Sequence, residues 1–163
     1  MFNNNVLKIF KILTVIALLV FWFPLFMQPK DSSTPYETVA AATLANLDLT
    51  DYPQKSIQTI KSLLKVDPAL YENIDLYRTD DGMNDRELVI AKFANKDAAD
   101  DFATKMEERR SSQEHLYSGY APDAEKLIKD GQVLVLGNYG IYVTGEQASS
   151  FVSQFEKAVR EGV

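Results

Sequence analysis

The stretch RELVIAKF, residues Arg86–Phe93, decides the fold that we predict for this chain. In an extended conformation its side chains alternate, so that Val89 and Ala91 share one face while Leu88 and Ile90 share the other. Both faces are largely apolar, which is typical of a strand that is buried on both sides. We therefore place this strand in the centre of a sheet.

Patterns on either side of this strand predict the rest of the fold. The other expected strands are Ile74–Tyr77, Val133–Leu136 and Tyr139–Val143, the last two joined by the hairpin signal Gly137-Asn138. Apolar residues at helical spacing predict helices over residues 35–47, 53–65, 96–117 and 120–129, and a last one after residue 147. The order α-α-β-β-α-α-β-β-α predicts an α+β fold, in which a four-stranded, mainly antiparallel sheet is packed with helices and preceded by one N-terminal transmembrane helix.

Several helix ends carry capping signals. Thr34-Pro35-Tyr36-Glu37 and Thr144-Gly145-Glu146-Gln147 both match the capping-box pattern, and Asn95 is expected to cap the helix over residues 96–117. The last helix shows the clearest amphipathic pattern of the chain, and its expected apolar stripe is Ala148, Phe151, Val152, Phe155, Ala158 and Val159.

An apolar stretch near the N-terminus predicts a membrane anchor. Ile12–Met27 comprises 16 uncharged residues, which is about 24 Å of helix, and the span becomes long enough when Lys8 and Lys11 extend toward the lipid headgroups. The same lysines predict a cytoplasmic N-terminus. We expect a single-pass signal anchor in the cell membrane, and the predicted divisions are a tail at 1–8, an anchor at 9–27, a linker at 28–33 and an extracytoplasmic α+β domain at 34–163.

Two alternatives stay open for this apolar stretch. A cleaved signal peptide has the same basic start and apolar middle, although the following residues, FPLFMQPK, contain no small-x-small cleavage site. The second alternative is a buried core helix, although soluble helices rarely carry so long an uncharged run. The chain has no cysteine, so it cannot carry the acylated cysteine of a lipoprotein, and disulfides and thiolate zinc sites are excluded as well.

The charge of the predicted domain limits its partners. Of the 17 basic residues, 14 lie beyond Lys30, as do all 23 acidic residues, so this part of the chain carries a net charge of −9. Such a domain is a poor ligand for nucleic acid or for an anionic membrane surface. The expected partners are the membrane, through the single N-terminal helix, and another envelope protein or a cell-wall polymer.

No sequence motif predicts catalysis, a metal or a cofactor. His115 is the only histidine, and the chain has no nucleophile-elbow serine, phosphate loop or dinucleotide fingerprint. The acidic turn Asp80–Asp85 could suggest calcium, but its glycine comes too early for an EF-hand loop. Asp85 and Glu87 are the carboxylates that a disguised cell-wall hydrolase or transferase would use, so an enzyme stays open as an alternative.

One polar constellation interrupts the apolar stripe of the helix over residues 96–117. If Arg109 or Arg110 points inward beside Gln113, the sheet must supply a partner, because an unpaired buried charge is costly. Glu87 or the backbone around Tyr139 could serve, and the sequence does not decide which arginine is buried. The candidate set is Glu87, Arg109, Arg110, Gln113, Tyr117, Tyr120 and Tyr139, which forms either a structural polar network or a pocket for an anionic or polar ligand.

The same region resembles a known family. The strand ELVIAK at residues 87–92, Gln113 after the arginine pair, the break Tyr120-Ala121-Pro122 and the late Gly137-Asn138-Tyr139 resemble the pattern of domain-of-unknown-function family 4358. The resemblance covers about residues 36–163. It implies a bacterial, mostly Gram-positive, membrane-attached protein that accompanies cell-envelope machinery such as membrane acyltransferases, and it implies no established activity. Many members look like lipoproteins, whereas this chain retains an apolar segment in place of the cysteine.

These observations lead to one expected function and two alternatives. We expect a membrane-anchored extracytoplasmic binding or accessory module of the bacterial cell envelope rather than an enzyme. A cell-wall-directed enzyme and a sensor domain for a small ligand or cation are the alternatives.

Overall fold

The computed structural model describes residue 8 and residues 11–19, 30–81 and 85–162. The chain divides into two compact units, Met1–Lys30 and Asp31–Val163. In the first unit, residues 11–19 are helical. No helix within the described residues is long and apolar enough to cross a membrane, and most of the predicted anchor at 9–27 lies outside those residues.

The second unit contains a four-stranded antiparallel sheet with the order β1-β2-β4-β3. The predicted central strand is β2, which pairs with β1 on one side and with β4 on the other. The sheet confirms the predicted α+β fold class. Its strands are β1 (Tyr71–Arg78), β2 (Glu87–Phe93), β3 (Gln132–Leu136) and β4 (Tyr139–Thr144).

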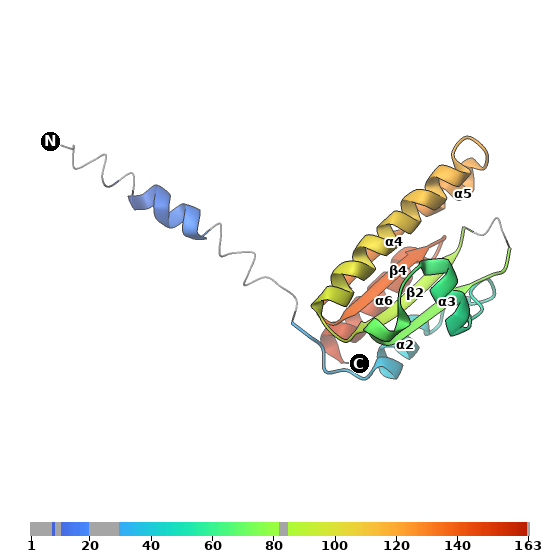
Figure 1. Cartoon of the computed structure of the whole chain (residues 1–163), viewed down its shortest axis with the longest axis horizontal. Coiled ribbons are helices and arrows are strands. Elements are labelled where there is room, and N and C mark those ends of the chain that lie inside the picture. Colours follow the sequence, from blue (N-terminus) through green and yellow to red (C-terminus); the bar gives the residue numbers. More distant parts are fainter. Residues whose placement is uncertain (1–7, 9–10, 20–29, 82–84, 163) are drawn as a thin grey trace. The chain divides into compact units, whose positions relative to one another are not determined.

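Helices cover both faces of this sheet (Figure 1). Each face has its own buried apolar cluster. Leu88 and Ile90 of β2 pack with α2 and α6, whereas Val89 and Ala91 pack with α3 and α4. The alternation read from residues 86–93 therefore assigns each side chain to its layer. The helices are α2 (Tyr36–Leu44), α3 (Ile57–Leu64), α4 (Lys96–Tyr117), α5 (Pro122–Lys129) and α6 (Ala148–Glu161), and a short 3-10 helix, η1 (Pro68–Leu70), precedes β1.

Helix α4 lies close to the sheet because β4 has a glycine beneath it. A Cβ atom at Gly140 would lie 2.5 Å from the ring of Phe93 and 2.8 Å from that of Phe102. These two rings pack with their centroids 5.3 Å apart and fill the space that the missing side chain leaves. This contact fixes the N-terminal half of α4 against β2 and β4.

Some predicted helix ends are confirmed. Helix α4 has the predicted bounds, and the side chain of Asn95 accepts a hydrogen bond from the backbone of Ala98. Helix α5 ends at the predicted Lys129 and has Pro122 at its first position. The six residues predicted for the apolar stripe of the last helix are the six buried residues of α6.

Both predicted capping boxes are wrong, because their threonines bond elsewhere. Helix α2 begins after Pro35 with no side-chain cap, and the hydroxyl of Thr34 accepts a hydrogen bond from Ser32 instead. Thr144 is the last residue of β4, where its hydroxyl accepts the backbone N–H of Glu87 at 3.0 Å. Helix α6 therefore starts without a side-chain cap.

Helices α2 and α3 are shorter than predicted. Helix α2 ends at Leu44, and Asn46 then adopts a left-handed conformation with φ of 58°. Helix α3 begins at Ile57, because residues 53–55 bond to the edge of β1 through the backbone pairs Lys55–Leu76 and Arg78–Pro53. Ser56 then caps the helix by accepting from the backbone of Thr59. Strand β1 is longer than predicted and starts at Tyr71.

The buried hydroxyl of Tyr71 makes the stability of the fold sensitive to alkali. Burial raises the pKa of Tyr71 to about 12, and the negative charge of Asp101 adds to the effect. Within the described part of the chain this hydroxyl has no hydrogen-bond partner. A folded-state pKa above the ordinary value of about 10 means that the neutral phenol stabilises the fold below pH 10, and this contribution is lost as the pH rises toward about 12.

Tyr71→Phe removes the titrating group without removing a hydrogen bond. We expect its free energy of unfolding at neutral pH to lie within about 1 kcal/mol of the wild type, and we expect it to lose less stability between about pH 10 and pH 12. Urea unfolding over a pH series measures both values. Tyr139→Phe is the contrast, because its hydroxyl donates to Thr34 O at 2.7 Å and its loss should already destabilise the protein at neutral pH. Equal alkaline losses in Tyr71→Phe and wild type would contradict the expectation.

Candidate functional site: a polar cavity beside a buried ion pair

The pairing of β1 with β2 builds the base of the site. Arg78, the last residue of β1, is the register partner of Glu87, the first residue of β2. Register partners lie on the same face of a sheet, and here this is the face that α3 and α4 cover. Glu87 is only 1% exposed, so its carboxylate requires partners inside the domain.

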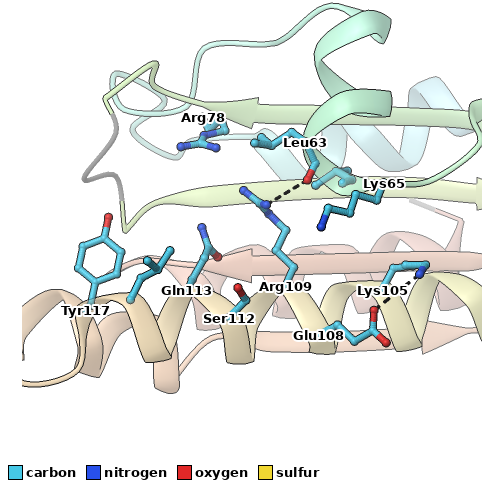
Figure 2. Close-up of a pocket in the computed structure, with 11 residues that line it drawn as sticks. Leu63, Lys65, Arg78, Lys105, Glu108, Arg109, Ser112, Gln113 and Tyr117 are labelled. Carbon is cyan, nitrogen blue, oxygen red and sulfur yellow. Dashed lines mark hydrogen bonds and ion pairs between the residues drawn. The ribbon is translucent and has the colours of Figure 1, made fainter.

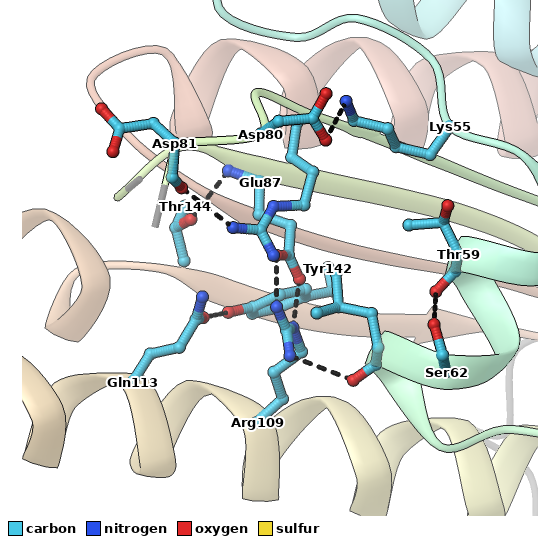
Figure 3. Close-up of polar contacts among 12 residues, drawn as sticks. Lys55, Thr59, Ser62, Asp80, Asp81, Glu87, Arg109, Gln113, Tyr142 and Thr144 are labelled. Carbon is cyan, nitrogen blue, oxygen red and sulfur yellow. Dashed lines mark hydrogen bonds and ion pairs between the residues drawn. The ribbon is translucent and has the colours of Figure 1, made fainter. Parts of the chain in front are cut away.

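Helix α4 supplies the main partner. Met106 and Gln113 are buried on the inner side of α4, and Arg109 lies between them at helical spacing. Its Nη2 donates to Glu87 Oε2 at 2.7 Å, its Nε donates to Glu87 Oε1, and its Nη1 donates to the carbonyl of Leu63 at 3.2 Å (Figure 3). All three nitrogen atoms of this guanidinium therefore have acceptors, and the bidentate pair joins α4 to β2 and to the end of α3.

Arg78 makes fewer and longer polar contacts than Arg109. Its Nη1 lies 3.6 Å from Glu87 Oε2, and its Nη2 makes a long contact of 3.4 Å with the carbonyl of Asp81. Its Nε is buried and has no hydrogen-bond partner among the residues that the structure describes. The side chain is nevertheless only 14% exposed, so Arg78 is a largely buried cation with unused donor capacity.

Two further polar contacts organise the same face. Tyr142 of β4 donates its hydroxyl to Oε1 of Gln113 at 2.8 Å, so the amide nitrogen of Gln113 points away from that contact (Figure 3). Burial raises the pKa of Tyr142, and the charge of Glu87 adds to this effect. Burial alone would lower the pKa of Arg109, but its hydrogen bonds to Glu87 and the charge of Glu87 raise it. The arginine and the tyrosine thus keep their protons at physiological pH.

A cavity of about 420 Å³ opens above these groups, between α3 and α4 (Figure 2). Ligand-binding pockets typically have volumes of about 300–1,000 Å³. Donor groups from both walls face this space, with Arg78 on the strand side and Gln113 and Ser112 on the α4 side. The other lining residues are Leu63, Leu64, Lys65, Lys105, Glu108, Arg109, Leu116 and Tyr117.

The cavity brings together only part of the predicted site. Arg109, Gln113 and Tyr117 line it, and Glu87 lies beneath it bonded to Arg109. Arg110 points outward, where it pairs with Glu107 and Glu114 and donates to the carbonyl of Lys129.

The two remaining predicted residues lie elsewhere. Tyr120 is 70% exposed and does not line the cavity. Tyr139 belongs to the opposite apolar cluster, beside Phe155, and its hydroxyl bonds to Thr34. The backbone partner of the buried arginine is therefore Leu63, not the segment around Tyr139.

Sequence reasoning missed Arg78, Tyr142, Lys65, Lys105 and Ser112. Arg78 could have been predicted from its position in the hairpin, because it ends one strand and Glu87 begins the partner strand. Opposite charges at paired positions of a hairpin predict an ion pair. Lys65 and Leu63 have no comparable signal, because only the packing of α3 on α4 brings them to the cavity.

The described residues offer no metal site. They contain no group of three or more His, Cys, Asp or Glu side chains that could hold an ion. Within the acidic turn, Asp80 pairs with Lys55 at 2.7 Å and Asp85 with Arg86 at 3.1 Å. Residues 82–84 of that turn lie outside the described part of the chain.

The fold and the cavity together define a small α+β domain with a ligand-sized polar pocket. The model of the family described as Domain of unknown function (DUF4358) matches residues 45–145, more than half of the chain, and the protein belongs to this family. No curated protein and no solved structure matches the chain significantly.

The ion pair between Glu87 and Arg109 makes a strong prediction about stability. Glu87→Gln removes the counter-charge of two largely buried arginines, so we expect the free energy of unfolding to fall by about 3–5 kcal/mol. Glu107→Gln is the matched control, since it removes a carboxylate that pairs with an arginine of the same helix at an exposed position. It should cost about 1 kcal/mol or less. Urea unfolding of both variants measures the difference, and similar losses would refute the assigned role of Glu87.

Proposed function

We propose that this protein is a membrane-anchored binding module of the bacterial cell envelope. In this proposal residues 1–8 lie in the cytoplasm, residues 9–27 form the anchor, and residues 34–163 form a domain outside the membrane. The uncharged run Ile12–Met27 and the preceding Lys8 and Lys11 support this arrangement. Residues 11–19, which form part of that run, are helical.

The observation that carries the binding role is the cavity between α3 and α4. It is large enough for a small molecule or for one unit of a polymer, and charged and amide donors line it. Arg109, which forms part of its wall, is locked by Glu87 and by the backbone of Leu63. A preformed wall of this kind favours binding because less ordering is needed when the ligand arrives.

The same geometry argues against the enzyme alternative. A general base must be able to accept a proton from the substrate. Glu87 is nearly fully buried and already accepts both arginine bonds, and Asp85 pairs with Arg86. These were the two carboxylates on which a hydrolase or transferase hypothesis rested. We therefore propose that the domain binds a cell-wall polymer or an envelope protein without transforming it.

The membrane arrangement can be tested by labelling, because the chain has no cysteine of its own. Ser150→Cys places a thiol on an exposed position of α6, and Asn4→Cys places one in the N-terminal tail. A membrane-impermeant maleimide added to intact cells should label Ser150→Cys and leave Asn4→Cys unlabelled until the cells are lysed. Labelling of the tail alone would reverse the proposed orientation.

The binding role can be tested at the rim of the cavity. Leu116 lines the cavity and is 73% exposed, so a photo-crosslinking amino acid there would lie beside any occupant. We expect it to form a discrete adduct with a cell-wall polymer or an envelope protein in intact cells. The same amino acid at Lys157, an exposed position on α6, should not form that adduct. Identical products from both positions, or none from either, would argue against the cavity as the binding site.

A further inference from the structure

The buried charges beneath the cavity do not balance. Arg78 and Arg109 contribute two positive charges, and Glu87 contributes one negative charge that both arginines share. Both arginine side chains are only 14% exposed. A buried ion pair is satisfied when every charge has a partner, so this group of three retains one positive charge without a buried counterpart of its own.

The excess charge resides on Arg78. Arg109 uses its Nε, Nη1 and Nη2 in hydrogen bonds, whereas Arg78 has one contact at 3.6 Å, one at 3.4 Å and an Nε with no acceptor in the described part of the chain. An unsatisfied buried donor is costly, and more so when the group is charged. The folded domain therefore keeps a guanidinium that an added acceptor would stabilise.

The walls around Arg78 favour an anion as that acceptor. Lys65 and Lys105 also line the cavity, and Glu108, the one carboxylate in its lining, pairs with Lys105 at 3.6 Å. Gln113 has its oxygen occupied by Tyr142, which leaves its amide nitrogen to donate. Figure 2 shows the amide of Gln113 and the guanidinium of Arg78 on opposite walls of the same space.

The charge is not uniform along the cavity. Burial raises the pKa of Tyr117, the charges of Asp85 and Asp81 raise it further, and the charge of Arg78 lowers it, so the end of the cavity near Tyr117 is close to charges of both signs. Lys105 lies several helical turns away from Tyr117 on α4, at the opposite end of the lining. Arg78 and Gln113 therefore lie toward the tyrosine end of the cavity, and Lys105 lies at the other end (Figure 2).

We propose that the cavity holds its occupant, a small molecule or one unit of a polymer, through one carboxylate or phosphate group, which Arg78 and the amide of Gln113 bind. This inference rests on the proposed binding function and names the chemistry of its ligand. A small rotation of the Arg78 side chain exchanges the long contact with Asp81 for a bidentate bond to the anion. Leu63, Leu64 and Leu116 then contact the apolar part of the ligand.

The net charge of the whole domain restricts the number of negative charges that the ligand can carry. Beyond residue 30 the chain carries a net charge of −9, which repels a polyanion at long range. A singly charged group is repelled far less and still gains the full local interaction with Arg78 inside the cavity. The site therefore selects a monoanionic group, carried either by a soluble molecule or by a lipid headgroup.

The test uses the full chain in detergent micelles and compares acetate with its neutral counterpart acetamide, alongside inorganic phosphate. Arginine Nε–H signals in nitrogen-15 NMR report on Arg78 directly, after assignment by Arg78→Lys. We expect acetate and phosphate to shift the Arg78 signal saturably, while acetamide leaves it in place. Arg78→Gln should weaken anion binding at least about tenfold, since it removes a charged hydrogen-bond donor. Lys157→Gln, which removes the same charge from an exposed position on α6, should bind like the wild type.

The two possible sources of the anion are separated by a second arm. Nanodiscs containing phosphatidylglycerol are compared with nanodiscs of phosphatidylcholine alone. A shift of the Arg78 signal only with phosphatidylglycerol assigns the group to a lipid headgroup, and a shift with acetate or phosphate assigns it to a soluble ligand. Either result supports the anion site.

Three results would overturn the inference, and they differ in what they say about the proposed function. If acetamide perturbs the signals of Gln113 while no anion shifts Arg78, the cavity binds a neutral ligand and the binding function stands. If no probe perturbs any residue of the cavity, or if Arg78→Gln binds anions as the wild type does, the anion site fails. If no probe perturbs any residue of the cavity, the photo-crosslinking result at Leu116 decides whether the binding function fails as well.

Discussion

The bidentate bond between Glu87 and Arg109 is the interaction on which the rest of this face depends. It joins the start of β2 to the middle of α4, and the third nitrogen of the same arginine bonds to the end of α3. The apolar contact of Phe102 with Phe93 and Gly140 fixes the N-terminal half of α4, and the ion pair fixes its more polar C-terminal half. The walls of the cavity follow from the position of that second half.

The bond also accounts for the mixed character of α4. Its N-terminal half packs on the sheet through Phe102 and Met106, whereas its C-terminal half turns Gln113 and Tyr117 inward. A polar stripe of this kind is costly unless every group finds a partner. The strands supply those partners, because Glu87 bonds to Arg109 and Tyr142 bonds to Gln113. Stability and the shape of the cavity thus arise from the same residues.

Much of the fold could be predicted from the sequence, because its strands and helices have strong local periodicity. Both faces of β2 and the stripe of α6 were assigned correctly from residue spacing alone. The two threonine capping boxes failed for different reasons: Thr34 bonds to the nearby Ser32, whereas Thr144 bonds to Glu87, a distant partner that a local pattern cannot reveal. Because the partners of Arg109 and Arg78 are also distant in the sequence, the inward position of Arg109 could not be distinguished from that of Arg110, and Arg78 was missed.

The segment that matches the family model includes the helices on only one face of the sheet. The matched segment, residues 45–145, contains all four strands but stops short of α2 and α6. Those two helices cover the face that carries Leu88, Ile90 and Ile141. A protein trimmed to the matched segment would expose this apolar surface to solvent. Exposed apolar surfaces of this extent promote aggregation. The matched segment therefore needs the flanking helices α2 and α6 to complete the second layer of the domain.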